Sequence, residues 1–329
     1  MSKQLSKNQK YTLLKLSNEF SNLDDVQKNI VNAEHRYWEP LTAVKNIPES
    51  VPHDDKHYLY KWDHFSDVEE ITFDGKNNLS FIVSTASIES GTRLLKDKIT
   101  GELLPREERL NISKVDTIFI ESQEEVYCII ATFDYYELKR VEKLIGFGSL
   151  EPIPARFQSE SDLFQWLFYK YIKNEFELNE EINLDSITGF TGTVVTEENK
   201  FEGQSDQVAE LIIAKAFITN GYPLTSIQLV LQTNEGFAGF YLGKLDNPKE
   251  LQITVQRLSN VVSLLGSVDA EISIPIYVYF YLIPKLVELY KLSEEEFTSG
   301  SKNKFLSEIG IEVIKTIMAK NDITINDLK

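Results

Sequence analysis

The four histidines of the chain all lie within residues 35–64, and this clustering is the first feature that could support chemistry. His53 and His57 are four residues apart, with Asp54 and Asp55 between them. Imidazole and carboxylate groups together can bind zinc, manganese or iron. The segment HDDKH matches no metalloprotease motif and follows a proline-rich loop, so solvated loop histidines are the competing interpretation.

Asp116 is a further candidate metal ligand beside His53 and His57. It lies in residues 115–120, a predicted strand that pairs with residues 126–132. In outline this pair resembles the core of metal-dependent nucleases, in which an aspartate on one strand and a Glu-x-Lys on the next hold a divalent cation. Where that pattern has its carboxylate and lysine, this chain has Ile129, Ile130, Ala131 and Thr132. The resemblance therefore implies a degenerate nuclease-like domain.

A small basic group lies between Gly91 and Lys114, in a chain with 34 Lys plus Arg, 51 Asp plus Glu and a formal net charge of −17. On a loop, such a group could bind phosphate or an acidic partner. Four acidic residues share the segment, and alternating charges are also typical of a solvated surface. The candidate nucleic-acid-binding residues are Arg93, Lys96, Lys98, Arg106, Arg109 and Lys114.

An acidic stretch without Lys or Arg occupies the chain between Asn174 and Asn199. Rows of surface carboxylates can imitate the phosphates of DNA and bind basic proteins. Most acidic proteins use such charge only for solubility, which is the competing interpretation. The acidic residues are Glu175, Glu177, Glu180, Glu181, Asp185, Glu197 and Glu198.

Other chemical motifs are not spelled out in the sequence. Gly146-x-Gly148 and Gly189-x-x-Gly192 do not extend into a nucleotide-binding loop, so we interpret them as turn glycines. The single cysteine, Cys128, allows no intrachain disulfide and is expected to be a small core residue. We expect no cofactor.

The elements that would carry the N-terminal candidates are predicted as α+β. Residues 11–16 and a segment capped by Asp24 and stopped by Pro40 are predicted to be helical. Residues 68–73 and 79–85 flank Asp74-Gly75 and predict a β-hairpin. An amphipathic helix is predicted over residues 135–145, ended by Gly146.

The remaining chain predicts a second α+β region. Ser159 and Asp162 suggest a capping box, and further helices are predicted over residues 206–220 and about 250–265, the last with a start that is equally typical of a strand. A hairpin is predicted from residues 227–232 and 237–242, and a buried strand over 272–281. Phe305, Ile309, Val313 and Ile317 predict a final amphipathic helix.

The predicted fold class is therefore α+β in two domains, each a small, largely antiparallel sheet with packed helices. The first domain is expected over residues 1–146, a linker rich in Gly and Pro over 147–158, and an acidic second domain over 159–329. The chain start lacks the apolar core of a signal peptide. The longest uncharged apolar run contains Pro275 and Pro284 and falls short of the roughly 20 residues that span a bilayer.

These features predict a cytoplasmic, non-enzymatic protein that acts through a protein partner, as an accessory or regulatory subunit of a bacterial complex. A role in phage defence or on a mobile element is compatible with this expectation. One alternative is a nucleic-acid-binding protein with a degenerate nuclease-like N-terminal domain that contacts phosphate through the loop between Gly91 and Lys114. Another is an acidic DNA mimic, and the oligomeric state is left open.

Overall fold

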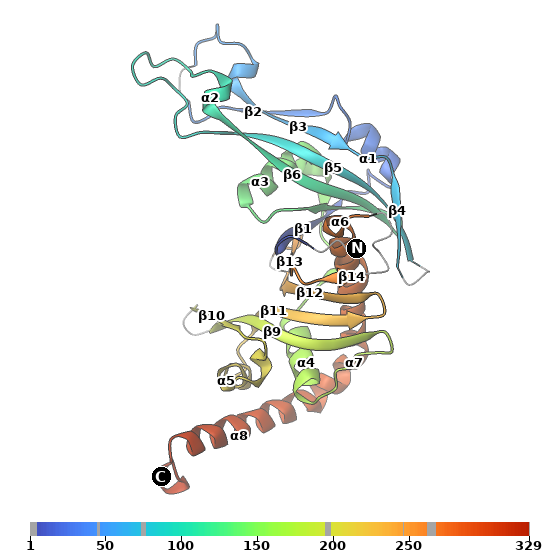
Figure 1. Ribbon diagram of the computed structural model, residues 1–329, viewed down its shortest axis with the longest axis vertical. Coiled ribbons are helices and arrows are strands. Elements are labelled where there is room, and N and C mark those ends of the chain that lie inside the picture. Colours follow the sequence, from blue (N-terminus) through green and yellow to red (C-terminus); the bar gives the residue numbers. More distant parts are fainter. Residues whose placement is uncertain are drawn as a thin grey trace. The chain divides into compact units, whose positions relative to one another are not determined.

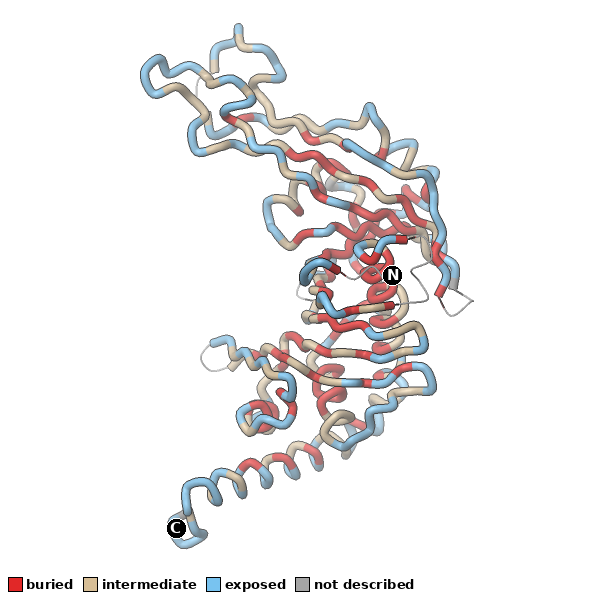
Figure 2. Tube along the Cα trace, viewed as in Figure 1, coloured by how far each residue is buried: buried red, intermediate tan, exposed pale blue. Residues whose placement is uncertain are grey.

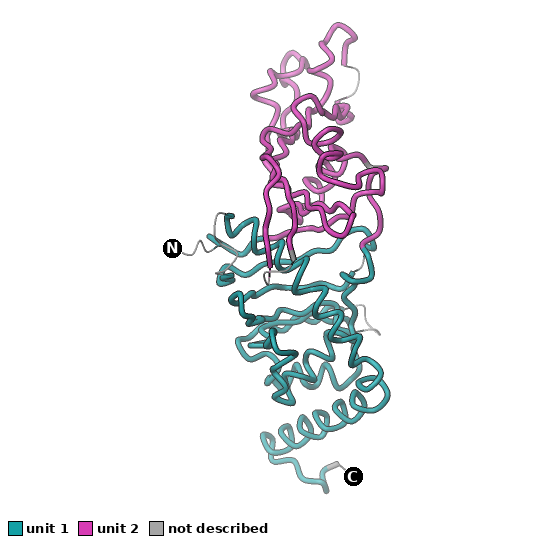
Figure 3. The backbone as a smooth tube through the Cα atoms, turned by 90° about the vertical axis from the view of Figure 1, so that its right-hand side faces the viewer, with its two compact units in different colours: residues 1–9, 154–329 teal, residues 10–153 magenta. Residues whose placement is uncertain are grey.

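The computed structural model describes residues 5–44, 47–73, 77–194, 199–245, 247–261 and 268–328. The chain is mixed α and β, with extensive antiparallel sheet and packed helices (Figure 1). It divides into two compact units (Figure 3). The N-terminal unit comprises residues 10–153, and the C-terminal unit comprises residues 1–9 and 154–329. That residues 1–146 and 159–329 are separate domains stays a prediction.

The sheet of the N-terminal unit is antiparallel, with the strand order β8-β1-β7-β6-β5-β3-β2 and β4 added to β5. Its strands are β1 (Gln9–Leu16), β2 (Arg36–Pro40), β3 (His57–Phe65), β4 (Glu69–Phe73), β5 (Asn77–Gly91), β6 (Leu110–Ser122), β7 (Glu125–Ile130) and β8 (Leu150–Glu151). Both predicted strand pairs of this region are confirmed, as β4 with β5 and β6 with β7. The Asp74-Gly75 turn lies outside the described residues.

Two helices, α1 (Leu23–Asn29) and α3 (Tyr135–Ile145), bury their apolar sides in one core with this sheet, and α2 (Arg106–Arg109) is a single turn. Asp134 caps α3 by accepting hydrogen bonds from the amides of Tyr136 and Glu137 at 3.0 and 2.9 Å. Gly146 follows with φ +111°, a backbone conformation that favours glycine, so the predicted helix and its end are confirmed. Cys128 is fully buried on β7, also as predicted.

The predicted helix over residues 11–16 is wrong, because this segment is β1. Its backbone pairs antiparallel with β7, where Leu14 lies opposite Cys128. Residues 11–16 are buried on both faces of the strand, so apolar residues do not alternate there and short-range periodicity cannot distinguish the strand from a helix. The next helix is also shorter than predicted, since Asn22 rather than Asp24 caps it and it ends at Asn29.

The sheet of the C-terminal unit is antiparallel with the order β10-β9-β11-β12-β13, and β14 pairs with β12. Its strands are β9 (Ile182–Val194), β10 (Asn199–Gln204), β11 (Leu224–Thr233), β12 (Gly236–Gly243), β13 (Leu251–Val255) and β14 (Asn260–Val261). This confirms the predicted hairpin as β11 with β12. The predicted helix at 250–265 is wrong over residues 251–255, where its alternative strand start is found; residues 262–267 lie outside the described ranges.

Helices cover one face of this sheet. They are α4 (Ser161–Ile172), α6 (Ala270–Tyr277) and α7 (Ile283–Glu296), while α5 (Ile212–Thr219) packs against α8 (Lys302–Lys320). On β11 the helix-facing residues Ile227, Leu229 and Leu231 are fully buried (Figure 2). The predicted capping box at α4 is wrong, because the Ser159 hydroxyl donates to the backbone oxygen of Gly243 at 2.7 Å instead. Where one helix was predicted over residues 206–220, the structure has a 3₁₀ turn, Val208–Glu210, followed by the shorter helix α5.

The run from α6 to α8 is one continuous helical stretch, so the predicted strand at 272–281 is wrong. Ile274, Ile276 and Val278 are fully buried in it, and complete burial removed the one-sided pattern that identifies a helix. A π-helical segment, Val278–Leu282, accommodates Pro284, which cannot donate to the preceding turn. A second π-helical segment, Phe297–Ser301, precedes α8.

This helical stretch, Ala270–Lys320, has the length and apolar composition that a membrane crossing requires. Of the most apolar 18 residues in this stretch, 61% are buried within the protein, and core helices of soluble proteins have the same length and apolar composition.

The predicted C-terminal helix is confirmed as α8. Phe305, Ile309 and Val313 are buried on it, although Ile317 is exposed.

Candidate functional site: a glutamine-lined cleft

The two candidate histidines are stacked on each other near the start of β3. Their ring centroids are 4.1 Å apart, and Trp38 lies edge-on to His53 at 5.3 Å. The Nδ1 of His57 donates to the backbone oxygen of His53 at 2.7 Å. This hydrogen bond spans the 3₁₀ turn Asp54–Lys56, which the two histidines flank, so the Nδ1 of His57 already has a partner within the protein.

Asp116 lies far from this pair. It accepts a hydrogen bond from Thr85 at 2.8 Å, and Thr85 pairs with His64 of β3. His64 is seven residues from His57 on the same strand, which corresponds to roughly 23 Å. Within the described ranges, no three His, Cys, Asp or Glu side chains form a group that could hold a metal ion.

Two of the six predicted phosphate-binding residues hold the protein's own loop. Arg106 pairs with Glu89 and donates to the backbone oxygens of Asp54 and His57. The Arg109 side chain is 1% exposed, and its guanidinium donates to the backbone oxygen and to the carboxylate of Asp55. The loop is thereby tied to the 3₁₀ turn, and these two guanidinium groups face inward.

The other four members of the basic group lie nearer to the surface. Lys114 pairs with Asp63 at 3.4 Å, Arg93 and Lys98 are exposed, and Lys96 is half-buried. The same loop is shaped by Asp97, whose carboxylate accepts from the amides of Thr100 and Ile99 at 2.8 Å each. These two backbone hydrogen bonds hold the pKa of Asp97 below its usual value.

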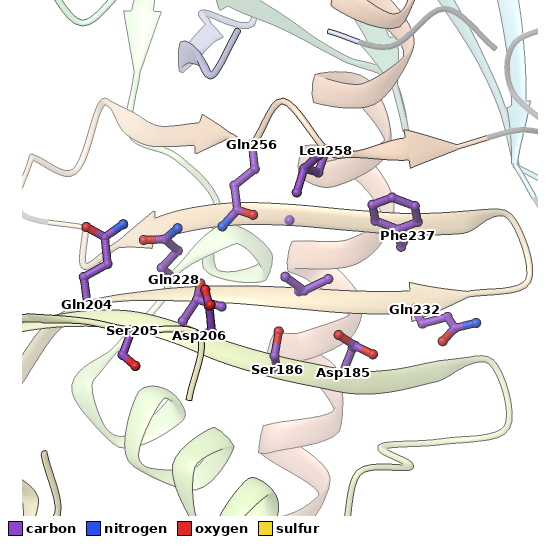
Figure 4. Close-up of a pocket in the computed structure, with 13 residues that line it drawn as sticks. Asp185, Ser186, Gln204, Ser205, Asp206, Gln228, Gln232, Phe237, Gln256 and Leu258 are labelled. Carbon is purple, nitrogen blue, oxygen red and sulfur yellow. The ribbon is translucent and has the colours of Figure 1, made fainter. Parts of the chain in front are cut away.

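A different feature, a cleft of about 690 Å³ on the C-terminal unit, is the candidate functional site (Figure 4). It lies on the face of the sheet opposite the helices. Its lining combines amides, hydroxyls, two carboxylates and a few apolar groups: Asp185, Ser186, Thr188, Gln204, Ser205, Asp206, Gln228, Val230, Gln232, Phe237, Gly239, Gln256 and Leu258.

Strand alternation supplies the floor of the cleft. Gln228, Val230 and Gln232 alternate on β11 with buried residues, so their side chains lie on the open face. Glycines leave room for the amides beside them. A Cβ on Gly239 would lie 2.5 Å from the Gln256 Oε1, and one on Gly189 would lie 2.9 Å from the Gln228 Oε1. Gly189 is thus a strand residue and not the predicted turn glycine.

Two irregularities in β9 direct further side chains into the cleft. The pairing of β9 with β11 shifts between the pairs Val230–Ser186 and Leu231–Leu184, which leaves Asp185 without an opposite residue. A second shift leaves Thr188 unpaired in the same way. Such bulges are frequent beside functional sites because they redirect side chains.

Two polar atoms of the cleft lack a hydrogen-bond partner. The Nε2 of Gln256 and the Oγ1 of Thr188 are buried, and neither has a partner in the part of the chain that the structure describes. Buried polar groups are nearly always paired, and an unpaired one carries a free-energy cost of about 1–3 kcal/mol. Both groups are therefore suited to bind polar atoms of a ligand.

The cleft is acidic, and none of the described residues that line it is a Lys, Arg or His. Asp185 and Asp206 are exposed, and their carboxylates make no ion pair among the described residues. The rest of the predicted acidic stretch is dispersed: Glu175 pairs with Lys170 at 2.6 Å and Glu181 accepts from Tyr281 at 2.9 Å. Glu177 and Glu180 are exposed elsewhere, and Glu197 and Glu198 lie outside the described residues.

Comparisons with known proteins add no assignment. The chain matches no protein-family model, and a search of curated proteins found no significant match.

Sequence reasoning missed this site, apart from Asp185 as one of the acidic residues. The available signal was two pairs of glutamines, each four residues apart: Gln228 and Gln232 on β11, and Gln252 with Gln256 on and after β13. An amide on the polar face of a strand carries no charge and fits no catalytic motif, so it does not stand out by residue type.

Proposed function

We propose that this protein is a non-enzymatic interaction component that binds a protein partner in the glutamine-lined cleft. The observation that supports this function is the donor and acceptor inventory of the cleft. An amide side chain donates and accepts hydrogen bonds at once, as a peptide backbone does. Four such amides, with hydroxyls beside them, line one concave surface.

The size and position of the cleft support the same function. A volume of about 690 Å³ lies in the range of clefts that enclose a ligand or a partner segment. The site is built on strands of a sheet whose opposite face is packed with helices, so its geometry is held before binding. A preorganised surface loses less conformational entropy when a partner binds.

The setting that we propose is a bacterial complex in the cytoplasm, with this protein as an accessory or regulatory subunit. A role in phage defence or on a mobile element is the biological context that such a subunit would suit.

The test is affinity capture with a charge-reversed cleft. The tagged full chain, the variant Asp185→Lys/Asp206→Lys and the control Glu177→Lys/Glu180→Lys are used with a nuclease-treated bacterial lysate. The control makes the same change of charge in the same unit at exposed acidic residues outside the cleft. Equal thermal unfolding of the three proteins establishes that each is folded.

We expect a stoichiometric protein partner with the wild type and the control, and at least a tenfold loss of it with the cleft variant. Equal capture by the cleft variant would contradict the proposed site. If the wild type retains no protein in stoichiometric amount, or retains only what nuclease removes, the interaction function itself is wrong.

A further inference from the structure

The chemistry of the cleft specifies what kind of partner segment it accepts. Resting on the proposed function, we propose that the cleft binds an extended peptide segment that carries a Lys or Arg side chain. Four properties of the site lead to this inference: its charge, its apolar side chains, its unpaired polar atoms and its width.

Charge selects a cationic group. Asp185 and Asp206 project into the cleft (Figure 4), and no basic side chain is found among the lining residues that the structure describes. From Glu151 to the last residue the sequence has 15 Lys plus Arg and 26 Asp plus Glu, a balance of −11. The local and the surrounding potential therefore both attract a cation and repel a phosphate.

Two apolar side chains lie across the cleft from the Asp185 carboxylate, beside Gln256. Phe237 and Leu258 lie on the β12 and β13 side in Figure 4. Val230 belongs to the floor, on the same face of β11 as Gln228 and Gln232. Lys and Arg side chains have long apolar stems and charged ends, so the stem can pack on apolar groups while the charged end reaches a carboxylate across the cleft. The ring of Phe237 can also attract a cation through its face.

The unpaired atoms suit a peptide backbone. The buried Nε2 of Gln256 is a donor and requires an acceptor, which a backbone carbonyl provides. The Thr188 hydroxyl and the amide of Gln228 can donate to or accept from further backbone groups. A bare cation or an amine without a peptide backbone would leave the Gln256 donor unpaired.

The width of the cleft suits an extended chain. Its lining extends over β9, β11 and β12 to the residues just after β13, and these four strands are successive neighbours in the sheet; Gln204 of β10 also belongs to it. Three strand spacings of about 4.8 Å give roughly 14 Å, the length of about four residues in extended conformation. A segment of four residues can therefore lie across the strands with one basic side chain directed at Asp185 or Asp206.

The test uses phage-displayed linear nonapeptides selected on the immobilised full chain. We expect at least a threefold enrichment of Lys and Arg at one position relative to the unselected library. A selected peptide is then synthesised with Lys, norleucine, acetyl-lysine or Glu at that position. Fluorescence anisotropy should show at least tenfold weaker binding of each of the three substituted peptides.

Matched variants locate the binding. Asp185→Asn/Asp206→Asn should weaken the Lys peptide at least tenfold, whereas the control Glu177→Gln/Glu180→Gln should leave it unchanged. Selection of peptides without basic enrichment, no selection above the bare support, or equal affinity for the Asp→Asn variant would each overturn the proposal.

The two proposals fail in different ways. If the charge-reversed cleft loses its captured partner while the library shows no basic preference, the cleft is a partner site and the basic segment is wrong. If the charge-reversed cleft retains the partner, the proposed site itself is wrong, whatever the peptides show.

Discussion

The guanidinium of Arg109 donates to the carboxylate of Asp55 at 2.8 Å and to the backbone oxygen of the same residue at 2.9 Å. The arginine is 1% exposed, whereas the Asp55 side chain is 37% exposed. One buried side chain therefore joins the loop before β6 to the 3₁₀ turn Asp54–Lys56. Its charge serves the structure of the N-terminal unit and is not available to an external phosphate.

Substitution of Arg109 should destabilise the protein strongly. Arg109→Met removes charge-assisted hydrogen bonds at a buried position, so we expect the free energy of unfolding to fall by about 2–4 kcal/mol. The control Arg93→Met removes the same charge from an exposed position and should change it by no more than about 0.5 kcal/mol. Urea unfolding measures both, and equal effects would contradict the internal role of Arg109.

The exposed basic residues of the same loop should not support nucleic-acid binding. Arg93, Lys98 and Lys114 are the exposed members of the predicted group, and Lys114 is already paired with Asp63. Three cations in a chain with a formal net charge of −17 are too few to hold a phosphate backbone at physiological salt. We expect no retention of a labelled 30-nucleotide strand at about 0.15 M salt. Retention that Arg93→Glu/Lys98→Glu abolishes would instead favour the nucleic-acid-binding alternative.

How far the fold could be predicted depends on how many faces of an element are covered. The helix at residues 135–145 has one polar side and a glycine at its end, and it is found as predicted. β1 is buried without a break over Tyr11–Leu16 and α6 over Ser273–Tyr277, and both were assigned to the wrong type of element. In both, burial on all sides removes the one-sided spacing of apolar residues from which the type of element is predicted.

The cleft was hidden for a related reason. The buried apolar residues of β9 are Ile182, Leu184, Ile187 and Phe190, a spacing that fits neither a regular strand nor a helix. The two bulges explain it, because each inserts one extra residue on the open face. A bulge depends on pairing with β11, which is distant in the sequence, so the positions of Asp185 and Thr188 could not be derived from local pattern.

Two glycines of the C-terminal helical stretch should respond in opposite directions to alanine. A Cβ on Gly310 would lie 2.7 Å from the Cγ2 of Thr219, whose hydroxyl is fixed by a hydrogen bond to the Lys215 backbone oxygen. Gly310→Ala should therefore lower the free energy of unfolding by about 1–2 kcal/mol. Gly300 has open space around it, and Gly300→Ala should raise that free energy by about 0.5–1 kcal/mol. Stabilisation by both substitutions would contradict close packing of α5 on α8.

The contact between α5 and α8 also contains a buried ammonium group with two carboxylate partners. The Nζ of Lys215 is 2.8 Å from Glu312 and 3.3 Å from Glu210, and the lysine side chain is 6% exposed. Burial by itself lowers the pKa of Lys215. The hydrogen bond to Glu312 and the charges of both glutamates outweigh burial, and the net pKa lies above the usual 10.5.

This raised pKa predicts a stability difference that disappears in alkali. A lysine whose pKa is higher in the folded state stabilises that state fully below the unfolded pKa, near 10.5, and loses this contribution as pH rises through the folded value. Lys215→Met should therefore be about 1–2 kcal/mol less stable than the wild type at pH 8, and the gap should narrow above pH 10.5. Urea unfolding of both proteins between pH 8 and about 12 measures the gap, with the exposed Lys315→Met as control. A gap that stays constant over this range, or that widens with pH, would show that the ammonium group contributes nothing through its charge.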